Sequence, residues 1–111
     1  MLYTDYIIVK PNDILTVLSE FKDQEAVYLE FSFNFLRINK KRIKATHGII
    51  KPKYTFIISK EDCQKLIKFY EEHNSSGALI QLKKDKILFY GWDENIERDV
   101  KLSFNANVKA A

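Results

Sequence analysis

The spacing of apolar side chains in the first half of the chain changes from helical to alternating. A short apolar run at residues 6–9 indicates a strand, and Pro11 after it suits the first position of a helix. Four apolar residues then follow at helical spacing: Ile14, Val17, Leu18 and Phe21. From residue 27 onward apolar and polar side chains alternate, which is typical of a strand with one buried face. We therefore expect a strand, a helix and a second strand.

The alternating strand predicts which of its side chains face the core. Val27, Leu29, Phe31 and Phe33 share the apolar phase, so the pattern places Phe33 on the core face. The opposite phase is formed by Tyr28, Glu30, Ser32 and Asn34. At residues 35–36 the apolar phase slips to the other parity, and a turn or bulge near Asn34 would produce that slip.

The second half repeats this order of periods. An apolar run at residues 56–58 leads to Ser59, a good N-cap with Asp62 three residues later, and the helix that follows has its own apolar stripe. That stripe consists of Cys63, Leu66, Ile67 and Tyr70. Shifting the first stripe by 49 positions superimposes it on the second. Strands are expected at residues 78–82, 87–90 and 100–104, with a turn at 93–95, and the matching last strand of the first half is expected at 42–49.

These patterns predict one α+β domain covering residues 1–111. It would contain two β-α-β-β-β repeats, at about 3–50 and 54–105, with two helices packed on an antiparallel sheet and an internal pseudo-twofold. The 111 residues suit a single core, and a composition of 46% hydrophobic and 14% aromatic residues is ample to fill it.

Two tandem β-α-β-β-β units of this size resemble one domain of the DNA sliding clamps, the ring-shaped polymerase processivity factors. The resemblance rests on the order of elements and the apolar spacing over most of the chain. It implies a clamp-like fold and a DNA accessory role. Because a clamp ring strings several such domains together, it also implies that this chain would assemble with others.

Composition narrows the setting of the protein. No apolar run approaches the ~20 residues of a membrane span, and no signal-peptide pattern opens the chain. The one cysteine, Cys63, excludes an internal disulfide, so we expect a cytoplasmic protein. Cys63 lies in the apolar stripe without an adjacent base, and the histidines, His47 and His73, have no metal-ligand spacing. No catalytic motif, cofactor site or metal site is recognisable, which predicts a protein that is not an enzyme.

The charge is distributed unevenly along the chain. Residues 1–36 have a net charge of −4, residues 37–60 a net charge of +8 without any acid, and residues 61–111 a net charge of −1. The basic segment offers seven candidate nucleic-acid-binding residues: Arg37, Lys40, Lys41, Arg42, Lys44, Lys51 and Lys53. Phe33, Phe35 and Tyr54 nearby would supply stacking rings. The alternative is that these cations only line the solvated side of a half-buried sheet.

The single tryptophan marks a second candidate surface. Trp92 follows a glycine and precedes a run of acids at an expected strand end, as a protein-interface anchor with an acidic rim would. The candidate residues are Trp92, Asp93, Glu94, Glu97 and Asp99. The alternative is that Trp92 belongs to the core at a sheet edge.

We therefore expect a non-enzymatic binding module. The first hypothesis is a small cytosolic inhibitor or immunity-type protein that neutralises a toxin or enzyme by direct binding, by analogy with other small α+β domains. The second hypothesis is a nucleic-acid-binding protein, or a clamp-like DNA accessory factor, that uses the basic segment.

Overall fold

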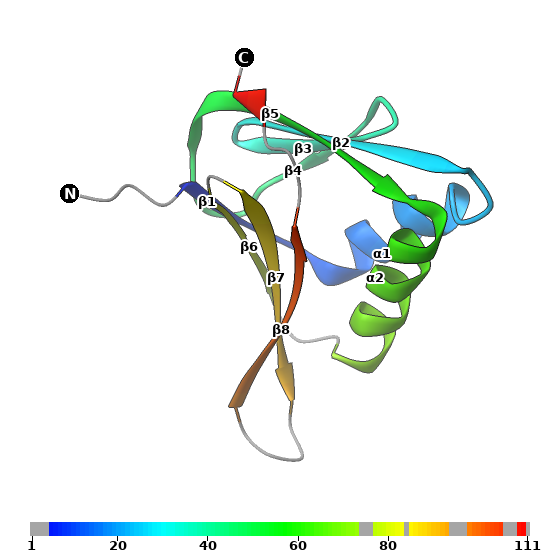
Figure 1. Cartoon of the computed structure of the whole chain (residues 1–111). Helices are drawn as coiled ribbons and strands as arrows, with labels where there is room; N and C mark the ends of the chain where they lie inside the picture. Colours follow the sequence, from blue (N-terminus) through cyan, green and yellow to red (C-terminus); the bar gives the residue numbers. More distant parts are fainter. Residues whose placement is uncertain (1–4, 74–76, 84, 94–97, 106–108, 111) are drawn as a thin grey trace.

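Figure 1 shows a computed structural model of the chain, which describes residues 5–73, 77–83, 85–93, 98–105 and 109–110. The elements follow one another as β1 (Asp5–Val9), α1 (Pro11–Glu20), β2 (Ala26–Phe33), β3 (Phe35–Ile38), β4 (Lys41–Lys44), β5 (Ile50–Ser59), α2 (Lys60–Glu72), β6 (Ala78–Leu82), β7 (Lys86–Asp93), β8 (Arg98–Asn105) and β9 (Lys109–Ala110). The protein is thus a small α+β fold that consists mostly of strands, with two helices and antiparallel sheets, as the sequence predicts.

The strands form two sheets, where the sequence analysis expected one. One is four-stranded, in the order β1-β6-β7-β8, and the other is five-stranded, in the order β4-β3-β2-β5-β9. Each sheet therefore combines strands from both halves of the chain: β1 pairs with β6 (Ile7 opposite Ile80), and β5 pairs with β2 (Phe56 opposite Leu29). The sheets meet at an angle, and α1 and α2 lie in the space between them (Figure 1).

A single hydrophobic core joins both sheets to both helices. Its fully buried side chains include Ile7 of β1, Leu18 of α1, Phe56 of β5, Tyr70 of α2 and Phe89 of β7. Tyr70 meets Phe89 edge to face, with ring centroids 6.3 Å apart. The core is consequently filled from elements of both halves, which makes the chain one packing unit.

Both helices begin where local chemistry favours it. Pro11 occupies the first turn of α1, where its missing N–H leaves no hydrogen bond unmade. At α2 the Ser59 hydroxyl accepts a hydrogen bond from the backbone N–H of Asp62 at 3.1 Å. These starts, and the buried faces formed by Ile14 and Leu18 in α1 and by Cys63, Leu66 and Tyr70 in α2, confirm the predicted helices.

Two predicted boundaries were wrong. The strand expected at residues 42–49 ends at Lys44, because the following segment turns to the other sheet: Thr46 N–H donates to Ile8 O (2.7 Å) and Ile8 N–H donates to His47 O (2.9 Å). Gly48 permits this crossing, since its φ is 93° and a Cβ there would lie 2.4 Å from the Tyr6 oxygen. Asp93, expected in a turn, is the last residue of β7.

One hydrogen bond ties the two sheets directly together. The Tyr54 hydroxyl on β5 donates to the Asp5 carboxylate on β1 at 2.7 Å, and this contact is partly buried. Burial first, and then the hydrogen bond and the negative charge of Asp5, raise the pKa of Tyr54 to about 12. Folding thus favours the neutral phenol.

Replacing Tyr54 by Phe tests this tie between the sheets. We expect Tyr54→Phe to lower the free energy of unfolding by about 1 kcal/mol at neutral pH, because the Asp5 carboxylate loses a donor. The phenol of the unfolded chain titrates near pH 10. The difference between wild type and variant should therefore be fully present below pH 10 and shrink as the pH rises toward 12. Denaturant unfolding across that range measures it; a difference that does not change with pH would contradict this role.

Candidate functional site

The side of the five-stranded sheet that faces away from the core gathers most of the candidate basic residues. Side chains alternate along a strand, so Leu29 and Phe31 of β2 enter the core while Tyr28 and Glu30 point outward, as the alternation predicted. Strand register places one row of outward residues opposite one another across β5, β2, β3 and β4: Thr55, Glu30, Arg37 and Arg42. We call this side the outer sheet face.

A cation–aromatic cluster lies on the outer sheet face. Phe35 on β3 is half-buried, with the Arg42 guanidinium 4.6 Å and the Arg37 guanidinium 5.8 Å from its ring centroid. Such contacts are attractive because the positive charge meets the negative face of the ring. Two guanidinium groups thus flank one ring, and Lys44 lies opposite Phe35 in the β3–β4 ladder.

Glu30 is the acid that interrupts this positive surface. Its carboxylate lies 3.8 Å from both the Arg37 guanidinium and the Lys53 ammonium. At that distance and with this exposure each ion pair is weak, so both cations keep most of their outward potential. Four other cations of the basic segment are exposed and make no ion pair within the described part of the chain: Lys40, Arg42, Lys44 and Lys51.

Lys41 departs from the rest of the basic segment. Its side chain turns toward the helices, where its ammonium contacts the Glu20 carboxylate of α1 at 2.7 Å. The edge between α1 and β4 also has a hollow of about 320 Å³, where Asp13 and Thr16 of α1 line the same space as Arg42 and Lys44. The side chain of Lys41 thus lies apart from the outer sheet face. Asp13 of α1 is an acid that lies near the margin of that face.

Phe33 is not on the core face, and this prediction was wrong. Its side chain is 61% exposed and its backbone φ is 55°, a left-handed conformation that is unfavourable for a bulky residue. The alternation ends at this point because the register between β2 and β5 shifts between Phe31 and Phe33, and because Phe33, the last residue of β2, lies beyond the last β2–β3 ladder pair, Ser32 with Phe35. The expected turn near Asn34 is therefore confirmed, and an exposed ring lies at that turn.

The β3–β4 connection is a tight two-residue turn that positions a lysine. Asn39 and Lys40 both have positive φ, 47° and 76°, between the ladder partners Ile38 and Lys41. Positive φ at both central residues is the requirement of a type I′ turn, where asparagine is favoured at the first position. The turn closes against β2, since Tyr28 N–H donates to Asn39 Oδ1 (2.8 Å) and Asn39 N–H donates to Tyr28 O (2.9 Å).

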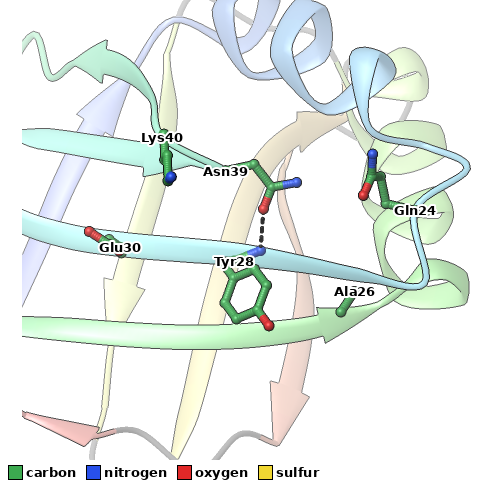
Figure 2. Close-up of a pocket in the computed structure, with 6 residues that line it drawn as sticks. All are labelled: Gln24, Ala26, Tyr28, Glu30, Asn39 and Lys40. Carbon is green, nitrogen blue, oxygen red and sulfur yellow. Dashed lines mark hydrogen bonds between the residues drawn. The ribbon is translucent and has the colours of Figure 1, made fainter.

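Beside this turn the surface is hollowed. Figure 2 shows the six residues that line a space of about 430 Å³: Gln24, Ala26, Tyr28, Glu30, Asn39 and Lys40. Tyr28 contributes a side chain that is 49% exposed, and it pairs across the ladder with Ile57, which is 60% exposed. The hollow is therefore a partly apolar depression with amide, carboxylate and ammonium groups on its margin.

The second candidate surface lies on a two-stranded arm. β7 pairs with β6 only through residues 87–89, whereas its pairing with β8 continues to Trp92 opposite Asp99 and Asp93 opposite Arg98. The arm extends away from the five-stranded sheet (Figure 1), and at Gly91 it packs closely against the C-terminal end of α2, where a Cβ would lie 2.8 Å from the His73 Cβ. The structure describes the backbone positions of Trp92, Asp93 and Asp99. Glu94 and Glu97 lie outside the described residues.

The described residues bring together no other chemical groups of note. Cys63 is fully buried between the helices, with its sulfur 4.0 Å from the Leu18 oxygen, and burial raises the pKa of its thiol. Within the described ranges, no group of three or more His, Cys, Asp or Glu side chains is placed to hold a metal ion. No helix there is long and apolar enough to cross a membrane.

No protein-family model, curated protein or solved structure matches the chain.

Two features of the outer sheet face were missed as site elements. Tyr28 was assigned to the outward phase of its strand, and an aromatic ring in a polar phase is itself a signal of an exposed contact surface. Asn39 followed by Lys40 between two short apolar runs is a hairpin signal. Together these two signals could have located the hollow.

Proposed function

We propose that this protein is a non-catalytic binding domain that contacts single-stranded nucleic acid through the outer sheet face. The observation that carries the proposal is the Phe35 ring flanked by the guanidinium groups of Arg37 and Arg42, with Lys44 opposite Phe35 on the next strand. Cations attract phosphates and exposed rings stack on unpaired bases, which is the combination that single-strand binders use. The exposed Phe33 and Tyr28 supply further rings at the same sheet.

The outer sheet face suits a single strand better than a duplex. In a duplex the bases are stacked inside, so the rings of a sheet face find no base to stack on. Phe33 adds support, because a strained backbone at a largely exposed ring is of no use to the core and points to a contact role. The proposed setting is the cytoplasm, where a lone buried thiol such as Cys63 stays reduced.

We also propose that the two halves of the chain are copies of one β-α-β-β-β unit. Two equivalent pairings support this: Val9 of β1 lies opposite Ala78 of β6, and Ser59 of β5 lies opposite Ala26 of β2. The proposed likeness to sliding clamps concerns the order of these elements and not their function. Exposed positions of α1 are acidic or neutral, including Asp13 and Glu20, and those of α2 mix lysines with glutamates, so the proposed nucleic-acid contact lies on the sheet.

Charge reversal tests the nucleic-acid proposal. We expect wild-type protein to bind a short labelled single strand in fluorescence anisotropy, with affinity falling as salt rises by a log–log slope of about −0.7 per phosphate contact. The triple variant Arg42→Glu, Lys44→Glu, Lys51→Glu should abolish binding while the domain stays folded, because all three are exposed and outside the described ion pairs.

The matched control for that experiment carries the same change of charge elsewhere. Lys22, Lys65 and Lys68 are exposed on or beside the helices, so replacing all three by Glu should leave most of the affinity intact. An equal loss of affinity in both triple variants would mean that binding depends only on the net charge of the protein and not on the outer sheet face. Absence of any salt-sensitive binding by wild type would remove the proposal.

A second candidate function is inhibition of a toxin or enzyme by a protein contact centred on Trp92. The observation that favours it is the position of Trp92 on the part of β7 that pairs with β8 alone. A protein contact at this arm would be centred on Trp92, with Asp93 and Asp99 as its neighbours in the β7–β8 ladder.

Thermal melting of Trp92→Ala tests this second candidate. An interface tryptophan contributes to binding and not to folding, so the variant should melt close to wild type while a partner captured from the native host is lost, at a cost of about 2 kcal/mol or more. Destabilisation by about 3–5 kcal/mol would show that Trp92 belongs to the core and would exclude this role.

A further inference from the structure

The hollow beside Tyr28 has the shape and lining of a small ligand site within the outer sheet face. Its volume of about 430 Å³ is at the lower end of the range for small-molecule pockets, which suits a single planar group. The Tyr28 ring supplies a half-exposed apolar surface, and polar groups of four residues lie around it: Gln24, Glu30, Asn39 and Lys40. The site therefore favours a ligand that is flat, aromatic and able to form hydrogen bonds at its edge.

The hydrogen bonds between Tyr28 and Asn39 hold the hollow in shape. The backbone N–H of Tyr28 can only donate, so the atom it contacts at 2.8 Å must be the Asn39 amide oxygen. The Asn39 amide nitrogen consequently points away from β2, toward Gln24, as Figure 2 shows. Two donor hydrogens of a fixed side chain are thereby presented to the open space.

The remaining groups on the margin complement a nucleotide. Gln24 offers an amide donor and an acceptor, Glu30 offers acceptors, and Lys40 offers a positive charge from a turn whose backbone is fixed. Amide side chains recognise the hydrogen-bonding edges of bases, a tyrosine ring stacks on their faces, and an ammonium attracts phosphate. Adenosine-like or other base-bearing ligands match this set, whereas an apolar ligand would form no hydrogen bond with the amide groups of Gln24 and Asn39.

We propose that this hollow is a subsite for one unpaired nucleobase, stacked on Tyr28, with its phosphate near Lys40. The inference rests on the proposed function, because the base would belong to the strand that Arg42 and Lys44 hold on the same sheet. In this subsite Tyr28 and Asn39 would bind a base directly, whereas Arg42 and Lys44 would bind the phosphates of the strand. A subsite of this kind makes affinity depend on a stacking ring as well as on charge.

Ring substitutions test the subsite with the same labelled single strand. We expect Tyr28→Phe to bind within about twofold of wild type, because the stacking face remains, and Tyr28→Ala and Tyr28→Leu to bind about 5-fold to 100-fold more weakly. The slope of affinity against salt should stay unchanged in all three variants, because no cation is lost. Lys40→Gln should instead reduce that slope by about 0.7.

The matched control is Tyr6 on the four-stranded sheet. Tyr6 is 45% exposed and Tyr28 is 49% exposed, so Tyr6→Ala removes a comparable ring from the other sheet and should leave affinity unchanged. If Tyr28→Ala and Tyr28→Leu bind the labelled nucleic acid as tightly as wild type, the subsite proposal is wrong and the proposed function still stands. Equal weakening by Tyr6→Ala would also overturn it. Wild-type protein that binds no strand would overturn both.

Discussion

Each sheet of this protein is completed by a strand from the other half of the chain. β1 enters the sheet formed by β6, β7 and β8, and β5 joins the sheet formed by β2, β3 and β4 before leading directly into α2. Neither half could bury its apolar faces alone, because the partner strand and the opposing core side chains come from the other half. The Tyr54–Asp5 hydrogen bond adds a polar link at the same junction.

This exchange of strands decides which surfaces are left for function. Both sheets turn one face to the shared core and both helices fill the angle between them, so the outer sheet face has no structural partner among the described elements. Side chains there are free of the packing constraints that govern the core. Arg37, Arg42 and Phe35 form their cluster on a scaffold whose geometry is fixed by the other side of the same strands.

Much of the local structure could be predicted because its causes are local. The helices follow from apolar spacing together with Pro11 and Ser59, and the turn near Asn34 follows from the change of parity. The division into two sheets could not be predicted, because periodicity tells which face of a strand is buried and not which strand lies beside it. Phe33 was misplaced because alternation was extended into a turn, where φ becomes positive and the side chain leaves the sheet pattern.

The candidate site shows the same division between local and non-local causes. The run of cations at residues 37–53 was visible in the sequence, but its separation into an outer group and a lysine that pairs with Glu20 depends on strand register. The hollow depends on Asn39 reaching Tyr28 eleven positions earlier, a contact that only the folded hairpin produces.

The most direct test of the central claim is a map of the surface that meets nucleic acid. Uniformly ¹⁵N-labelled protein titrated with a short single strand should show backbone amide shift changes concentrated on β2, β3 and β4, including Tyr28, Arg37 and Arg42, with little change in α1, α2 or the β7–β8 arm. Changes concentrated on the helices or on the arm, or no changes at all, would contradict the account.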